Sequence, residues 1–305
     1  MSATIIDGRA LAERLRRSID EELQVLRLSE VAPGLATVLV GDDPAAAAYE
    51  RHLRRLAEGL GYHYVCERLP AAVEPADALA TVGKLNADPR VTGILLLRPL
   101  PAHLRHADLD ATVDPRKDIE AAHPTNVGLL ALGTPRFLPS TPASCFYALD
   151  AYLRDSGREP SAFYARALVC VVGRSSTVGK PAQWLALQRD ATVIACHSRT
   201  DAAGRLGELT RLADVVLVAA GVPKLLRPEM VRPGAIVLDV GFHQLPDGSI
   251  VGDVDPRVAE VAEALTPVPG GIGPITDVWL VGNALAAAAI ARQVEPRFGS
   301  GTARG

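Results

Sequence analysis

The sequence has few features of membrane, secreted or nucleic-acid-binding proteins. Its net charge is only −3 over 305 residues, and Lys and Arg are dispersed among Asp and Glu, so no basic surface for nucleic acid or anionic lipid is indicated. No apolar run reaches the roughly 18 residues of a membrane span, and residues 1–17 lack the basic-then-apolar order of a signal peptide. We therefore expect a cytoplasmic protein with neither a nucleic-acid nor a membrane partner.

Cysteine and histidine are also sparse. The four cysteines form no C-x-x-C pair, which favours free thiols in a reducing compartment over a disulfide framework. His103 and His106 are the only closely spaced histidines, and no third ligand lies near them in the sequence. We therefore expect no metal site.

Short apolar runs alternate with segments of helical periodicity along the chain. The runs that predict strands are 36–40, 93–97, 167–172, 192–196, 215–219 and 235–239. The segments that predict helices are 10–28, a helix that opens at 42–44, 144–155, 181–188, 203–212 and 278–292. Strands separated by helices are typical of α/β proteins with a parallel sheet covered on both faces.

A change of composition near residues 138–142 suggests two domains, as the chain length does. We expect a split substrate-binding domain of residues 1–142 plus 277–305, because the last helix is predicted to return to the first domain. Residues 143–276 are expected to form a Rossmann-like nucleotide-binding domain.

The segment Gly173–Pro181 joins a predicted strand to a predicted helix, where doubly wound proteins bind phosphates. It matches neither G-x-G-x-x-G nor a Walker loop. Arg174 and Ser175 supply charge and a hydroxyl, and Ser198 and Arg199 follow the next strand where NAD-specific folds have an acid. This pattern favours NADP; the alternative is an ordinary polar loop with solvated arginines.

Residues 267–276 contain three prolines and three glycines, which the predicted last helix follows. Such a sequence is incompatible with a helix or a central strand, and it holds one backbone shape. The segment itself leaves two interpretations open: a loop that faces a ligand, or a rigid connector between domains.

Taken together and in order, these motifs resemble those of the bifunctional methylenetetrahydrofolate dehydrogenase/methenyltetrahydrofolate cyclohydrolase (FolD) family over nearly the whole length. The segments that carry the resemblance are 40–44 with Tyr49, 99–101, 117–118, 139–142, 173–175, 178–179, 197–198, 239–241, 252–255 and 267–276.

The resemblance implies a split folate-binding domain, a Rossmann-like NADP-binding domain and a homodimer that acts in one-carbon metabolism. It implies hydride transfer from 5,10-methylenetetrahydrofolate to NADP, followed by addition of water to the methenyl cation. The implied cofactor contacts are Gly173, Arg174, Ser175, Ser198 and, more weakly, Phe242. The implied folate contacts are Tyr49, Pro269, Gly270 and Gly271.

The chain departs from the family pattern on the folate side. Leu53 stands where Y-x-x-x-K has the catalytic lysine, and Leu97 stands where the family has the glutamine that supports this lysine. Glu120 replaces the aspartate that binds the pterin, and Ala121 replaces the following glycine. Leucine carries no proton, and loss of a general acid/base typically costs about 10²–10⁴-fold in rate.

These departures favour an NADP-dependent methylenetetrahydrofolate dehydrogenase whose cyclohydrolase activity is weak or absent. His52 is expected to point to a different helical face and not to replace the lysine. Two alternatives stay open: a repurposed paralogue that uses a folate or one-carbon adduct in specialised metabolism, and a catalytically dead nucleotide-binding dimer.

Overall fold

The computed structural model describes residues 2–28, 30 and 32–298. These residues form two compact units: one holds residues 2–15 and 140–276, and the other holds residues 16–139 and 277–298. The sequence places residues 1–15 in the expected substrate domain, whereas the compact units group residues 2–15 with residues 140–276. Helices α1 (Gly8–Arg27) and α11 (Ile272–Ala291) each contain residues of both units.

The first unit contains a parallel six-stranded sheet with strand order β1-β11-β8-β7-β5-β6. The strands are β1 (Thr4–Ile5), β5 (Leu168–Val172), β6 (Thr192–Cys196), β7 (Val215–Val218), β8 (Ile236–Asp239) and β11 (Ala264–Leu265). The central strands β7 and β8 are buried along their whole length, as expected for continuous apolar runs with both faces covered.

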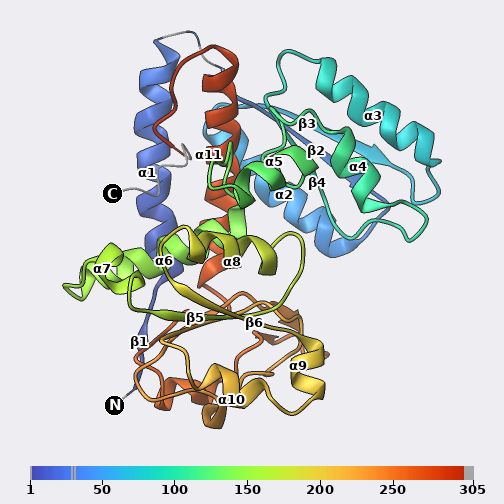
Figure 1. Cartoon of the computed structure of the whole chain (residues 1–305). Helices are drawn as coiled ribbons and strands as arrows, with labels where there is room; N and C mark the ends of the chain where they lie inside the picture. The colour runs from blue at the N-terminus through green and yellow to red at the C-terminus, as the bar shows by residue number, and fades with distance from the viewer. Residues whose placement is uncertain (1, 29, 31, 299–305) are drawn as a thin grey trace. The chain divides into compact units, whose positions relative to one another are not determined.

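Helices cover both faces of this sheet. Figure 1 shows α6 and α8 on one side of β5 and β6, and α9 and α10 on the other. The helices and short elements of this unit are α6 (Ser140–Asp155), α7 (Pro160–Tyr164), α8 (Gly179–Leu187), α9 (Ser198–Ala202), α10 (Leu206–Thr210), η1 (Pro228–Met230), η2 (Pro256–Glu260) and the hairpin of β9 (His243–Gln244) and β10 (Ile250–Val251).

The second unit contains a parallel three-stranded sheet with order β3-β2-β4, and its helices include α2, which lies against β2 and β3. Asp43 caps α2 by accepting a hydrogen bond from the Ala46 amide, and Pro44 occupies the first helical position. The elements are β2 (Gly34–Val40), α2 (Pro44–Gly59), β3 (His63–Leu69), α3 (Pro75–Ala87), β4 (Gly93–Leu96), α4 (His106–Thr112) and α5 (Pro124–Ala131).

The structure confirms the predicted α/β class and corrects three local expectations. Helix α11 begins at Ile272, so Gly273 and Pro274 are helical; a proline in the first turn removes an amide that has no intrahelical partner. The single helix expected at 203–212 is instead α9 and α10, separated at Gly204, whose φ is +70°. Helix α11 is also long and apolar enough to span a membrane, but 72% of that window is buried within the protein, as in a core helix.

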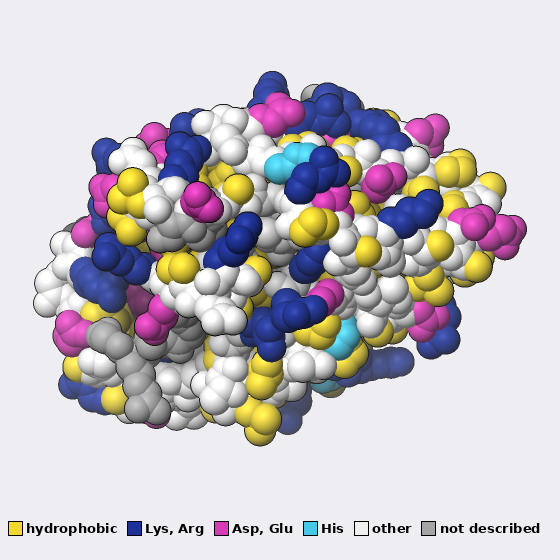
Figure 2. Space-filling model, turned by 90° about the horizontal axis from the view of Figure 1, so that it is seen from above, with side chains coloured by type: hydrophobic (Ala, Val, Ile, Leu, Met, Phe, Trp, Pro, Cys, Tyr) yellow, Lys and Arg dark blue, Asp and Glu magenta, His cyan; other side chains and the backbone are white. Residues whose placement is uncertain are grey.

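Acidic and basic side chains alternate on the molecular face seen in Figure 2, with hydrophobic side chains scattered among them. This distribution agrees with the net charge of −3 and with the dispersal of Lys and Arg along the sequence.

Candidate functional site

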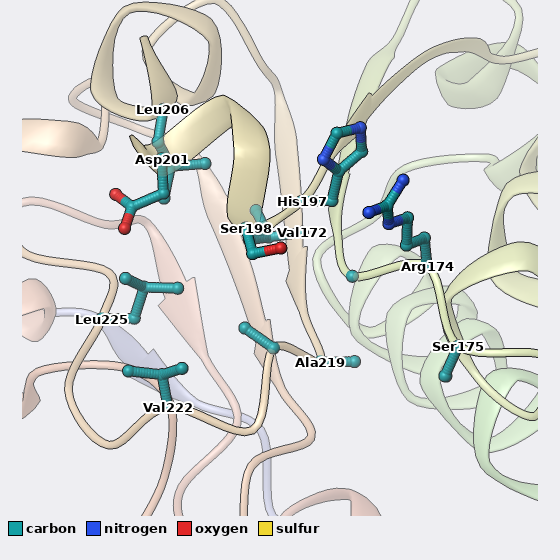
Figure 3. A pocket seen from close by; sticks show the side chains of 12 residues that line it. Val172, Arg174, Ser175, His197, Ser198, Asp201, Leu206, Ala219, Val222 and Leu225 are labelled. Atoms are coloured by element: carbon teal, nitrogen blue, oxygen red, sulfur yellow. The ribbon is translucent and has the colours of Figure 1, made fainter. Parts of the chain in front are cut away.

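A cavity of about 240 Å³ lies in the first unit, at the carboxyl ends of three neighbouring parallel strands. This is where doubly wound α/β folds bind their ligands. Figure 3 shows its lining side chains, which come from the segments after β5, β6 and β7. The lining residues are Val172, Gly173, Arg174, Ser175, His197, Ser198, Asp201, Leu206, Ala219, Ala220, Val222 and Leu225.

Two glycines determine the backbone path at the edge of this cavity. Gly173 has φ +142°, and a Cβ atom there would lie 2.3 Å from the carbonyl oxygen of Ala219. A Cβ on Gly179 would lie 2.4 Å from the backbone of Gly173. The loop between β5 and α8 therefore requires glycine at both positions, and this leaves its backbone open to a ligand.

Polar groups at the cavity are partly used by the protein and partly free. The Ser175 hydroxyl oxygen accepts hydrogen bonds from the amides of Val178 and Gly179, so its proton stays available to a ligand. Among the described residues, Arg174 and Ser198 have no hydrogen-bonding or ion-pair partner for their side chains. An unpaired guanidinium beside free hydroxyls fits an anionic group such as a phosphate.

The structure does not bring every predicted cofactor residue to this cavity. Arg199 lies on α9 but is not among the lining residues, and Phe242 follows β8 with 66% of its surface exposed. Asp201, which the sequence analysis did not select, does line the cavity. Its position in the first turn of α9, just after the end of β6, is the signal that could have identified it.

The loop with Pro269, Gly270 and Gly271 is packed tightly within the first unit. Gly270 has φ +103°, and a Cβ on Gly271 would lie 2.5 Å from the Pro267 carbonyl oxygen. A Cβ on Gly8 would lie 1.7 Å from the carbonyl oxygen of Gly271. Because these contacts leave no space for side chains, the loop has one fixed shape.

In the second unit, α2 and the first turns of α11 carry a cluster of polar side chains. His52 Nε2 lies 3.0 Å from Asp277 Oδ2, and the Tyr49 hydroxyl is hydrogen-bonded to the same carboxylate. Burial, followed by the charges of Asp277 and Glu120, holds the pKa of Tyr49 well above its usual value. Tyr49 therefore stays protonated near neutral pH, so its hydroxyl can donate its proton but cannot act as a base.

His52 lies on a different face of α2 from Leu53, since its side chain is 50% exposed and Leu53 is 0% exposed. It nevertheless shares one carboxylate with Tyr49, three residues earlier on the same helix. Asp277 could not be identified from the sequence, since its two partners are more than 220 residues away in the chain.

The two leucines at the departing positions are buried. Leu53 is 0% exposed, one helical turn after Tyr49, and Leu97, which follows β4, is 3% exposed. Neither side chain can accept, donate or store a proton. Any proton transfer near them must therefore use other groups.

Glu120 is half-buried, and hydrogen bonds fix the backbone around it. Its pKa is raised to about 7, chiefly by burial; nearby Arg98 lowers it, and Asp118 and Asp110 raise it. Its carboxylate accepts no hydrogen bond from the described residues. The buried Asn283 donates to the carbonyl of Ile119 at 2.7 Å, which fixes the backbone beside Glu120.

A turn and an ion pair complete the surroundings of Glu120. Asp118 accepts hydrogen bonds from the amides of Ala122 and His123, which closes the turn that contains Glu120. The guanidinium of Arg98 donates to both carboxylate oxygens of Asp110 at 3.1 Å, and it also contacts His106. Arg98 is therefore neutralised mainly by Asp110 rather than by Glu120.

Among the described residues, no group of three or more His, Cys, Asp or Glu side chains is arranged to hold a metal ion. The two closely spaced histidines have other contacts: His103 Nε2 lies 2.9 Å from the Val73 carbonyl oxygen, and His106 contacts Arg98.

Comparison with known proteins also divides the chain near residue 139, although the two matched family models differ from the compact units at residues 6–15 and 277–292. The family model "Tetrahydrofolate dehydrogenase/cyclohydrolase, catalytic domain" matches residues 6–120. The model "Tetrahydrofolate dehydrogenase/cyclohydrolase, NAD(P)-binding domain" matches residues 139–292. The two models correspond to the two kinds of α/β domain that the sequence predicts, including the Rossmann-like one.

Individual relatives are similar over almost the whole chain. Bifunctional protein FolD 3 of Rubrobacter xylanophilus is 57% identical over 294 residues, which cover 94% of this chain and 92% of that protein. The FolD methylenetetrahydrofolate dehydrogenase/cyclohydrolase structure from Campylobacter jejuni is 35% identical with a TM-score of 0.87, covering 95% of this chain and 100% of that one. The Trypanosoma brucei FolD structure, complexed with NADP and an inhibitor, is 33% identical with a TM-score of 0.86, covering 95% and 99%.

Proposed function

Because the chain belongs to the tetrahydrofolate dehydrogenase/cyclohydrolase (FolD) family, we propose that it is an NADP-dependent 5,10-methylenetetrahydrofolate dehydrogenase whose cyclohydrolase step is weak or absent. Family membership makes it an oxidoreductase of one-carbon metabolism with an NAD(P)-binding domain and tetrahydrofolate substrates. The chain's own residues favour NADP and disfavour the second step.

The first unit supports binding of a phosphorylated cofactor. The nicotinamide dinucleotide supplies the hydride acceptor when it is bound. Arg174 offers an unpaired guanidinium, and Ser175 and Ser198 offer hydroxyl protons at the same cavity. The segment after β6 begins with His197 and Ser198, and its first acid, Asp201, comes three residues after Ser198. The unpaired Arg174 at the same cavity favours NADP over NAD.

The second unit supports hydride transfer better than hydrolysis. Oxidation of the methylene group produces a methenyl cation, and acidic groups stabilise positive charge that develops in a transition state. Glu120 and Asp277 supply such groups around Tyr49. Alignment of the two reacting carbons does not require a residue that transfers protons.

One observation carries the proposed loss of cyclohydrolase activity: the residue one turn after Tyr49 is a fully buried leucine. Addition of water to the methenyl cation requires removal of a proton from that water. Without a general base at this position, the expected loss in rate is about 10²–10⁴-fold.

The purified protein tests this proposal directly. We expect NADP reduction with methylenetetrahydrofolate, faster than NAD reduction, together with methenyltetrahydrofolate hydrolysis close to the uncatalysed rate. Leu53→Lys alone should restore little hydrolysis, because Leu97 cannot support the new ammonium group; Leu53→Lys with Leu97→Gln should restore more. Lack of turnover with both NADP and NAD would contradict the dehydrogenase, and rapid hydrolysis by the wild type would contradict the proposed loss.

The apolar replacements also favour a second candidate, a repurposed paralogue that uses folate or a one-carbon adduct in specialised metabolism. This candidate requires a second FolD gene in the same genome that retains Y-x-x-x-K, and it predicts biosynthetic genes beside this one. A genome with this gene as its single copy would exclude it.

The family resemblance further supports a cytoplasmic homodimer, and sedimentation of the purified chain tests the oligomeric state. A dimer that only binds nucleotide is a third candidate. Calorimetric titration with tetrahydrofolate separates it from both enzymes, since a scaffold without catalytic activity has no need to bind folate.

A further inference from the structure

The carboxylate of Asp277 connects two side chains of α2 to α11 within the second unit; both helices are labelled in Figure 1. It lies 3.0 Å from Nε2 of His52 and is hydrogen-bonded to the Tyr49 hydroxyl. The Asp277 side chain is 19% exposed and that of His52 is 50% exposed. The Asp277 carboxylate therefore links a solvent-accessible imidazole to a largely buried phenol.

The protonation states of the three groups determine what this connection does. Tyr49 keeps its proton near neutral pH, because burial and the charges of Asp277 and Glu120 raise its pKa. The proton is donated to Asp277, so the hydroxyl oxygen can accept a hydrogen bond from a ligand but has no second proton to donate. A proton relay through Tyr49 would require the disfavoured phenolate, whereas an anchor for its ring requires only the hydrogen bond.

His52 adds a charge that depends on pH. Its hydrogen bond to Asp277 raises its pKa, burial lowers it, the charge of Asp277 raises it, and the charge of Arg55 on the same helix lowers it. From the other elements, Asp277 on α11 and Glu120 after β4 act on the neighbouring Tyr49. Below its pKa, His52 anchors Asp277 with a charge-assisted hydrogen bond; above it, the same nitrogen offers only a neutral donor.

We propose that Asp277 and His52 are positioning residues that hold Tyr49 in the orientation in which it contacts the folate substrate. This inference rests on the proposed function. In the resembled family, a lysine and a glutamine provide the polar pair beside this tyrosine. Here Leu53 and Leu97 occupy those positions, and the polar support of Tyr49 comes instead from α11 and from the residue before Leu53.

The proposal predicts a specific dependence of the KM for methylenetetrahydrofolate on pH. His52→Gln keeps a neutral donor at a similar position but removes the charge, so its KM should exceed that of the wild type about five-fold below the His52 pKa. The two values should converge as the pH rises above the His52 pKa, where both side chains are neutral. Asp277→Asn removes the charged acceptor and should raise this KM about ten-fold across the whole range.

A double-mutant cycle tests whether Asp277 acts through the phenol. In a Tyr49→Phe background, Asp277→Asn should raise the KM less than two-fold further, because the hydroxyl it holds is already absent. Strict additivity of the two substitutions would contradict the proposal. The KM for NADP and the melting temperature are measured in parallel; equal changes in both KM values, or a loss of stability without a change in the folate KM, would show a merely structural contact and also overturn it.

The matched control is His103→Gln, because His103 also bonds through Nε2, in this case to the Val73 carbonyl oxygen in the same unit. It should follow the wild type at every pH. A His52→Gln profile parallel to that of the control would overturn the proposal.

Calorimetric titration with tetrahydrofolate over the same pH range separates this proposal from the proposed function. If the wild type shows no turnover, the dehydrogenase assignment fails, and the Kd values of the variants still test the positioning. A Kd that responds to none of the three substitutions contradicts the positioning role, whatever the wild type catalyses.

Discussion

The two units build their candidate sites in different ways. The cavity of the first unit is shaped by backbone: Gly173 and Gly179 lie where any Cβ would overlap a neighbouring main chain. The cluster of the second unit is made of side chains: Asp277 and Glu120 act on Tyr49, and Leu53 and Leu97 are buried. A backbone-built site tolerates little change, because each glycine is restrained by several neighbours. A side-chain-built site can exchange its charges while the backbone stays in place.

This difference offers a reason why the departures inferred from the sequence motifs fall on one side. The cofactor motif at residues 173–175 matches the family pattern, whereas the inferred departures are at Leu53, Leu97, Glu120 and Ala121 on the folate side. A change at the first site disturbs the chain path. A change at the second replaces one chemistry with another at a modest cost in packing.

The largest expected effect comes from breaking the backbone-built site. Gly173→Ala places a Cβ 2.3 Å from the Ala219 carbonyl oxygen, at a φ of +142° that an L-residue rarely adopts. Strain and overlap together should cost about 3–5 kcal/mol. We expect the affinity for NADP to fall at least 100-fold and the melting temperature to fall with it, measured by calorimetry and by thermal unfolding.

Gly59→Ala is the matched control, because a Cβ there meets no atom within 4 Å. It should leave the NADP affinity and the melting temperature unchanged within the error of the measurement. If Gly173→Ala behaved like this control, the contrast between a backbone-built and a side-chain-built site would fail.

The sequence predicted most of the backbone-built region, and physical reasons explain this. Strands β5, β7 and β8 are short, almost fully buried runs that consist mainly of Val, Leu and Ile, and the glycines between β5 and α8 signal a close approach of the backbone. Local sequence carries both signals. It was less successful with β3 (His63–Leu69), a half-buried edge strand whose mixture of polar and apolar residues gives no clear period.

The side-chain-built region depends on contacts that local sequence does not carry. The contact of Asp277 with His52 joins positions 225 residues apart, so periodicity along α2 could not reveal it. The raised pKa of Glu120 likewise arises from burial and from charges brought by other segments. Motif resemblance located Tyr49, Leu53 and Glu120, but their mutual arrangement required the fold.

The second prediction uses the raised pKa of Glu120 to test the side-chain-built site. The folded protein binds this proton up to a pH of about 7, whereas the unfolded chain releases it near 4.5. The free energy of unfolding should therefore be highest below the lower value and should decrease as the pH rises through the upper one. The difference between these two values corresponds to about 3 kcal/mol.

Glu120→Gln removes this proton equilibrium. The variant should match the wild type near pH 4.5 and exceed its stability by about 3 kcal/mol at pH 8, measured by urea unfolding at both values. Glu58→Gln on the exposed face of α2 provides the control and should follow the wild type throughout. Equal stability of wild type and Glu120→Gln at pH 8 would show that solvent reaches the carboxylate freely.

The smallest expected effect comes from the opposite substitution, alanine to glycine, in the second unit. Ala121 has φ +54°, a conformation that costs an L-residue about 1–2 kcal/mol. The family pattern has glycine at this position. Ala121→Gly should relieve this strain. It also removes a methyl group that is only 3% exposed and adds freedom to the unfolded chain, and each of these costs about 0.5–1 kcal/mol. The net change in the free energy of unfolding should therefore stay below about 1 kcal/mol in either direction.

An exchange between alanine and glycine at Gly173 should cost several times more. A methyl group fits beside Glu120 but has no room beside Ala219. Urea unfolding of the two variants under one set of conditions measures that ratio, and similar changes at both positions would mean that the two sites are restrained alike.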